Sequence, residues 1–201
     1  MSTELTIAKP KNLEALDANI GSDTDDAAPL RFKDGQWLEG FDKAFLERGT
    51  IMRFAPLSIQ DGYVRWTDGK PVDTRIREWI GTAGAILRET LGDLDEREWP
   101  SGKDPWSYQL IAALKDAKGT LYKFSTGSTG GVNAIRKLMR AWRRDRDKYP
   151  GRVPVVALGA DSYLHKIHKT TILVPTFEIV GWEVWDENAQ PAIEAVRPKS
   201  Y

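Results

Sequence analysis

The segment Ser125–Gly131 reads Ser-Thr-Gly-Ser-Thr-Gly-Gly and leads directly into a helical pattern. Backbone N–H groups at a helix start, preceded by small residues, are able to bind phosphate. A nucleotide-hydrolysing loop is excluded, because that motif needs a lysine followed by Ser or Thr where Val132 and Asn133 stand. A hydrolase nucleophile elbow is excluded as well, since Thr126 occupies the position of its first glycine. Ser128 therefore either caps the helix or contacts a phosphate.

The segment that follows carries a strong charge bias. Residues 132–152 hold eight basic and two acidic side chains, a net charge of +6. Residues at three- and four-residue spacing predict one amphipathic helix over 131–148, with the apolar stripe Val132, Ile135, Leu138, Met139 and Trp142. The opposite face carries the arginines Arg136, Arg140, Arg143 and Arg144. Few acids are interleaved, so we expect this face to contact nucleic-acid phosphates, an acidic protein partner or the chain's own acidic segment.

Two β-rich runs, 108–114 and 120–126, predict a hairpin just before the helix. Within the second run Tyr122 and Phe124 share one face, and Lys123 lies on the other. One interpretation is a platform on which Tyr122, Phe124 and the nearby Trp106 stack on bases while Lys123 pairs with a phosphate. The alternative interpretation is that Tyr122 and Phe124 belong to the core.

A group of acidic residues could in principle hold Mg²⁺ for phosphodiester cleavage: Asp93, Asp95, Glu96 and Glu98. Their alternation with Leu94, Arg97 and Trp99 more simply indicates a solvated loop. The two histidines, His165 and His168, have no neighbouring carboxylate in the sequence. We therefore expect no metal site, no cofactor and no enzymatic activity.

The remaining elements are predicted from hydrophobic pattern and turn residues. Alternation over 62–67 followed by Asp68-Gly69 predicts a hairpin, and residues 73–91 have helical spacing. Residues 153–158, 162–166, 171–174 and 176–185 predict strands. Trp66, Trp79 and Trp142 sit in apolar patterns and are expected in the core.

The order strand, strand, strand, helix, strand, strand predicts an α+β domain with an antiparallel sheet or an OB-like barrel. We expect residues 1–30, with a net charge of −4, to form a flexible acidic arm. Residues 31–188 would be the single globular domain and 189–201 a tail. The chain has no cysteine, which excludes disulfides and thiolate sites. No signal sequence or membrane span is evident, so we expect a soluble cytoplasmic protein without a membrane partner.

Four segments together resemble small bacteriophage or prophage proteins of replication and recombination modules: Phe124–Gly131, the basic helix, Pro154–Leu158 and Val174–Trp182. They also loosely resemble phage single-stranded-DNA-binding proteins built on OB-folds. The resemblance implies a non-catalytic single-stranded-DNA-binding protein. One departure is the C-terminus, which lacks the acidic tail of many proteins of that class.

We therefore expect a nucleic-acid-binding set of nine residues: Trp106, Tyr122, Lys123, Phe124, Ser128, Arg136, Arg140, Arg143 and Arg144. Two other functions remain open. The basic helix could meet an acidic host protein, as in a phage adaptor or inhibitor, or the acidic loop could serve a metal-dependent nuclease.

Overall fold

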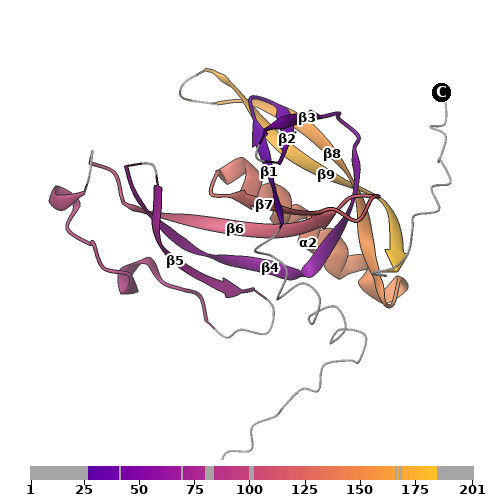
Figure 1. Ribbon diagram of the computed structural model, residues 1–201, viewed down its shortest axis with the longest axis horizontal. Coiled ribbons are helices and arrows are strands. Elements are labelled where there is room, and N and C mark those ends of the chain that lie inside the picture. The colour runs from indigo at the N-terminus through magenta and orange to yellow at the C-terminus, as the bar shows by residue number, and fades with distance from the viewer. Residues whose placement is uncertain are drawn as a thin grey trace, which may run out of the picture.

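The computed structural model describes residues 27–40, 42–68, 70–79, 84–99, 102–165, 167 and 169–184. Within these residues, nine strands form one strongly curled, half-barrel sheet, and one α-helix packs against it (Figure 1). The expected α+β class is confirmed. Most of the predicted acidic arm, residues 1–26, and the whole predicted tail, 189–201, lie outside the described residues.

The first three strands form an antiparallel meander: β1 (Ala28–Lys33), β2 (Gln36–Glu39) and β3 (Ala44–Leu46). Residues 28–30 were expected in the flexible arm, and that boundary was wrong, because they pair in parallel with residues 122–124. Leu30 is fully buried, whereas Arg31 and Lys33 are exposed on the other side of the strand. A strand in which polar residues alternate with apolar ones over only six residues is easily mistaken for coil.

The long strand β4 (Ile51–Thr67) pairs with β5 (Lys70–Glu78), which confirms the hairpin predicted at residues 68–69. The helix predicted over 73–91 was wrong. Its first part is β5, and its remaining described residues contain only the short 3-10 helix η2 (Arg88–Thr90). Pairing with β4 supplies a backbone hydrogen-bond ladder that outweighs helical spacing over so short a segment.

The second predicted hairpin is confirmed as β6 (Trp106–Lys115) and β7 (Leu121–Thr126). Gly119 has the positive φ, +90°, that its turn requires. The predicted helix is α2 (Thr129–Asp145), continued by the 3-10 turn η5 (Arg146–Lys148). All residues of its predicted apolar stripe are buried in the main core: Val132, Ile135, Leu138, Met139 and Trp142.

The last two strands, β8 (Arg152–Leu164) and β9 (Thr171–Val184), form one long antiparallel hairpin. The sequence divided each of them into two shorter strands. Pairing runs through both expected gaps, since Ala160 lies opposite Pro175. Proline is tolerated there because β9 is an edge strand, so the missing N–H breaks no ladder.

The strand order is β3-β2-β1-β7-β6-β4-β8-β9, and β5 pairs with β4. The strands β4, β6, β7, β8 and β9, with α2 between the third and fourth of them, have the predicted OB-like layout. Between β7 and β9 the half-barrel is bridged by a side chain of β2. Trp37 is fully buried against Phe124 and Phe177, and its Nε1 donates to the carbonyl of Gly159 at 2.8 Å.

Candidate nucleic-acid interface

Three aromatic residues expected to stack on bases lie in the protein interior. Trp106, Tyr122 and Phe124 are 5%, 6% and 2% exposed. The Tyr122 hydroxyl donates to Oε2 of Glu39 at 2.5 Å, and burial together with this bond raises the pKa of Tyr122. Nε1 of Trp106 donates to Oδ2 of Asp93 at 3.0 Å. The stacking role is therefore corrected, because the face of β7 that carries the two rings is turned into the core beneath α2.

The glycine-rich turn before α2 fits tightly against the sheet. Oγ of Ser128 accepts a hydrogen bond from the N–H of Gly131 at 3.1 Å, so this residue caps the helix as predicted. A Cβ on Gly131 would lie 2.1 Å from Oγ1 of Thr126, and one on Gly127 would lie 2.5 Å from a β6 carbonyl. Close backbone packing thus accounts for these glycines without a phosphate ligand.

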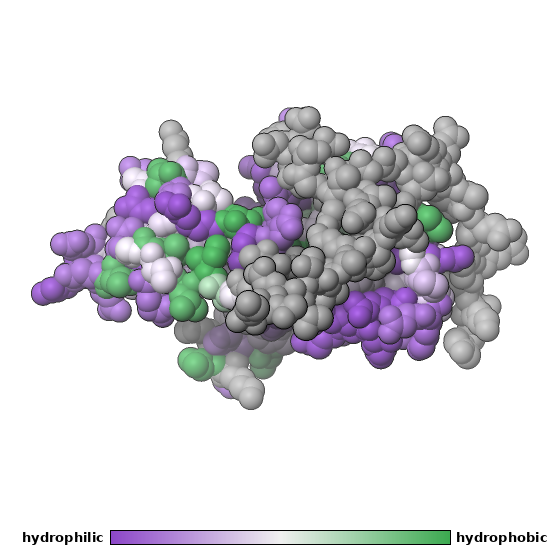
Figure 2. Space-filling view, turned by 90° about the horizontal axis from the view of Figure 1, so that it is seen from below, coloured by the Kyte–Doolittle hydropathy of each residue, from purple (hydrophilic) through white to green (hydrophobic). Residues whose placement is uncertain are grey.

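The arginines of α2 are all exposed, as expected: Arg136, Arg140, Arg143 and Arg144. Arg144 pairs with Asp145 at 2.6 Å, and Nζ of Lys148 reaches the same carboxylate at 2.8 Å. Hydrogen bonds from Arg144 and then Lys148 lower the pKa of Asp145 to about 2. Among the described residues, Arg140 and Arg143 have no ion-pair partner. Hydrophilic side chains form a band along the lower edge of Figure 2, on the side where α2 lies behind the sheet in Figure 1.

The basic face of α2 and Lys123 lie on opposite sides of the sheet. The apolar stripe of α2 packs in the same core as Tyr122 and Phe124, and the helix arginines point away from that core. Lys123 alternates with the two rings along β7 and so points to the other side. The expected site residues are therefore divided between two surfaces. A single nucleic-acid strand could contact both surfaces only if it passed around an edge of the sheet.

A chain of hydrogen bonds crosses that other side of the sheet from β4 to β7. Nε1 of Trp66 donates to Oγ of Ser107 at 2.7 Å, and Nε2 of Gln109 donates to the same oxygen at 3.3 Å. Oγ of Ser125 donates to Oε1 of Gln109 at 3.1 Å. We call these four residues the polar ladder. Trp66 was expected in the core and this was wrong: it is 39% exposed, because strand alternation places it beside Ser107.

Three residues of the polar ladder, Trp66, Gln109 and Ser125, line a groove of about 590 Å³. Arg31 and Lys33 of β1 line one side, and Pro71 and Thr74 of β5 line the other. Two members of the expected set also border it: Ser128, from the turn before α2, and Phe124 of β7. We name this groove the sheet groove. It combines an exposed indole ring, hydrogen-bonding groups and two cations.

The sequence did not single out Arg31, Lys33 or Gln109. The alternation Arg-Phe-Lys in residues 31–33 could have indicated a strand with outward-facing cations. It was overlooked because these residues directly follow the segment that was predicted as a flexible acidic arm. Gln109 lies in a strand that was predicted correctly. Its outward position depends on the pairing of β6 with β4 and β7, which no local pattern reveals.

Two of the four acids of the nuclease alternative, Asp93 and Asp95, are held by protein donors. Asp93 pairs with Arg65 at 2.8 Å and Asp95 with Arg97 at 2.7 Å, and hydrogen bonds from these arginines lower both carboxyl pKa values. In the described part of the chain, no three His, Asp or Glu side chains are grouped to hold a metal ion. His168 lies outside the described residues. The acidic loop therefore gives the nuclease alternative no support.

No helix among the described residues is both long and apolar enough to cross a membrane. The chain matches no protein-family model, and no curated protein or solved structure is significantly similar to it.

Proposed function

We propose that this protein is a non-catalytic single-stranded-DNA-binding protein that holds the strand in the sheet groove. The observation that carries the proposal is Trp66, an exposed ring that shares the groove with two cations. In OB-folds, oligonucleotides bind across the second and third strands. In this chain those strands are β6 and β7, and Gln109 and Ser125, on the face that they turn away from the core, line the groove.

Base stacking on Trp66 is favoured by the way the ring is held. Its Nε1 bond to Ser107 orients the indole before any ligand arrives, which reduces the side-chain entropy lost on binding. Stacking of one base on such a ring contributes about 1–3 kcal/mol and tolerates any base, because every base has a π face. Trp66 thus takes the role that the sequence assigned to Trp106, Tyr122 and Phe124.

The phosphates would meet the cations on β1. Arg31 and Lys33 project from alternate positions of one strand, about 6.6 Å apart along it. Both side chains are exposed, and Lys33 has no ion-pair partner among the described residues. Lys123 lies on the same side of the neighbouring strand β7, opposite Pro29. Sequence-tolerant, salt-sensitive binding follows from these contacts.

The test is a titration of a labelled single-stranded oligodeoxynucleotide of about 15 nucleotides, near the upper site size of one OB domain. We expect binding at about 50 mM salt that weakens strongly at about 200 mM. Trp66→Ala should weaken it roughly 5- to 150-fold, the equivalent of about 1–3 kcal/mol. The double variant Arg31→Ala, Lys33→Ala should lower the slope of log K against log[salt] by about 1.4, since each single-strand phosphate contact contributes about 0.7.

The control is the double variant Arg140→Ala, Arg143→Ala, which removes the same charge from the far side of the sheet. We expect it to change affinity much less than the β1 pair. A larger loss in this control would contradict the sheet groove as the site. Absence of binding at low salt, or affinity unaffected by salt, would overturn the function itself.

A further inference from the structure

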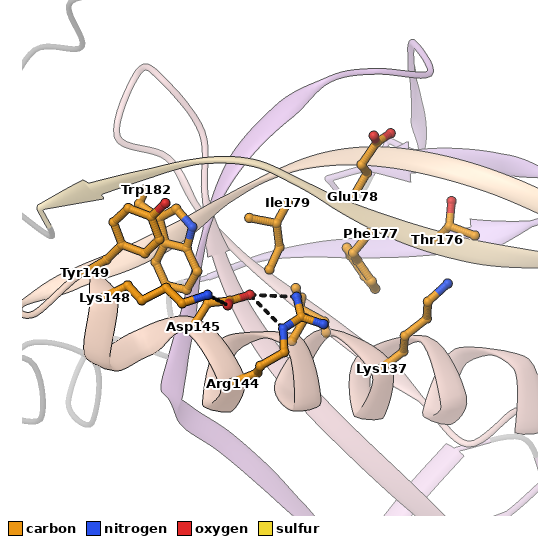
Figure 3. Close-up of a pocket in the computed structure, with 12 residues that line it drawn as sticks. Lys137, Arg144, Asp145, Lys148, Tyr149, Thr176, Phe177, Glu178, Ile179 and Trp182 are labelled. Atoms are coloured by element: carbon orange, nitrogen blue, oxygen red, sulfur yellow. Dashed lines mark hydrogen bonds and ion pairs between the residues drawn. The ribbon is translucent and has the colours of Figure 1, made fainter.

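A second groove, of about 690 Å³, lies between α2 and the edge strand β9 (Figure 3). Phe177 and Ile179 point from β9 toward the helix, while Lys137 and Arg144 reach from the helix toward β9. Leu138 adds further apolar surface from α2. The groove thus has apolar walls with basic side chains extending into it, and we name it the edge groove.

The edge groove runs along the backbone of β9. Four consecutive residues, Thr176–Ile179, line it, although side chains of a strand alternate between its two sides. Figure 3 shows this alternation, with Thr176 and Glu178 pointing away from α2. No residue of β8 lines the groove, and in the described sheet β9 is the last strand. The N–H and C=O groups on this edge are therefore available to another strand.

The accessible stretch of edge is limited at both ends. At one end stands Pro175, which has no N–H to donate. At the other, Val180 has no partner on β8, because the register shifts between Val155 and Val156. Prolines and bulges commonly protect sheet edges from indiscriminate pairing. The segment Thr176–Ile179 is left as a short site between two such features.

The charge of the edge groove favours an acidic ligand. It is lined by Lys137, Arg144 and Lys148 against Asp145 and Glu178. Lys137 has no ion-pair partner among the described residues. Arg144 lies near the end of α2 and Lys148 in the 3-10 turn η5, about 6–8 Å apart along the axis, which is comparable to the ~6.6 Å between alternate side chains of a strand.

We propose that the edge groove docks an extended acidic segment of a partner protein. This segment pairs with β9 as an additional strand and directs alternate carboxylates at Lys137, Arg144 and Lys148. Edge pairing supplies main-chain hydrogen bonds, and the alternate side chains supply selectivity. The surface is separate from the sheet groove, and the inference does not depend on nucleic-acid binding there.

A peptide fits this groove better than a nucleic acid for two reasons. The available backbone groups match another main chain, and the apolar walls beside the cations suit the methylene groups of glutamate side chains that reach toward α2. In addition, the rings of Tyr149 and Trp182 stack on each other, with centroids 4.7 Å apart and planes at 14°. One face of the Trp182 ring is therefore already covered by protein.

The test uses the full chain and a labelled octapeptide that alternates glutamate with threonine and valine, followed by fluorescence anisotropy at about 0.15 M salt, where the screening length is about 8 Å. We expect the peptide to bind and its lysine-for-glutamate counterpart not to bind. N-methylation of alternate backbone amides, which removes donors without changing charge, should weaken binding by about tenfold or more. Equal binding of the methylated peptide would overturn strand addition.

Variants of the protein test the charge assignment in both directions. Lys137→Glu should weaken peptide binding about tenfold, whereas Asp145→Asn should tighten it about threefold by releasing Arg144 and Lys148. The matched control is Arg140→Glu, an exposed cation of the same helix that does not line the groove. We expect it to change affinity less than about threefold. Circular dichroism would verify that each variant is folded.

The same variants separate the two grooves. Trp66→Ala should leave peptide affinity unchanged, and Lys137→Glu should leave oligonucleotide affinity nearly unchanged. If an oligonucleotide displaces the peptide and loses as much affinity in Lys137→Glu as the peptide does, the edge groove is a nucleic-acid contact. That result would overturn the peptide proposal.

Discussion

Asp145 partly neutralises the positive charge of the edge groove. At the end of α2 its carboxylate receives hydrogen bonds from both Arg144 and Lys148. These bonds hold two otherwise flexible side chains on one acceptor and favour the ionised form of the acid. Asp145 therefore contributes a pH-dependent part of the protein's stability. It also determines how many cations of the groove are left to bind a ligand.

The pKa of Asp145 predicts where this contribution to stability disappears. Its folded-state pKa, about 2, lies below the ordinary value of 3.8, so the contribution is present above pH 4 and is lost as the pH falls toward 2. We expect the wild type to lose slightly more stability across this window than Asp145→Asn, which cannot titrate. Urea denaturation at about pH 7, 4 and 2 measures this difference. Parallel losses in the two proteins would contradict the assignment.

At the scale of elements, the start of α2 is positioned by contact rather than by sequence propensity. Two glycines in its first turn, Gly130 and Gly131, are poor helix formers. They are accommodated because any larger residue at 131 would meet Thr126 of β7, and one at 130 would meet Val174 of β9. The helix start is thus wedged between two strands, which sets the position of the basic face and of the edge groove.

Gly131→Ala tests this close approach. Its Cβ would lie 2.1 Å from Oγ1 of Thr126, so the helix start must shift. We expect a loss of about 1–3 kcal/mol despite the better helix propensity of alanine. Thermal denaturation should show a fall in Tm of about 2–4 °C per kcal/mol. The control is Asn133→Ala, an exposed position of the same helix where alanine should be neutral or slightly stabilising. Equal stability of the two variants would refute the close packing.

At the scale of the whole molecule, a formal net charge of zero conceals a strong segregation. The first 30 residues carry −4 and residues 132–152 carry +6, while two further cations line the sheet groove. Separated patches of opposite charge act over distances comparable to the Debye length, about 10 Å at 0.1 M salt. Any polyanion that approaches the protein therefore competes with the protein's own acidic residues for its cationic surfaces.

Neutralising part of the acidic segment should strengthen oligonucleotide binding. We expect Asp25→Asn with Asp26→Asn to tighten binding a few-fold at low salt, and the gain to vanish as salt screens the charges. Titrations of the full chain over a range of salt concentrations measure the effect. The matched control, Glu96→Gln with Glu98→Gln, removes two acids from the loop between β5 and β6. An equal gain in this control would indicate a general charge effect without any special role of residues 25 and 26.

Much of the fold could be predicted from local sequence. The turn between β4 and β5, the β6–β7 hairpin and the helix capped by Ser128 were predicted correctly, because turn residues and periodicity are local signals. β1 was missed because its parallel partner β7 lies far away in the sequence. β5 was predicted as helix because apolar residues at helical spacing continue past its end, although its partner β4 is its neighbour in the chain. The candidate site could be predicted only in part, since its cations on β1 lie in the strand that was missed.

The sequence by itself determined the segregation of charge, the amphipathic helix and the alternation of side chains along each strand. Only the tertiary structure decided which side of each strand faces solvent. Trp66 and Trp106 illustrate the reason: Trp106 pairs with Arg65, one position before Trp66, and the two rings lie on opposite sides of the sheet. Because the side-chain period of a strand is two, a one-residue difference in register exchanges core and surface. Register is set by pairing between distant segments, and so it also decided where the two grooves lie.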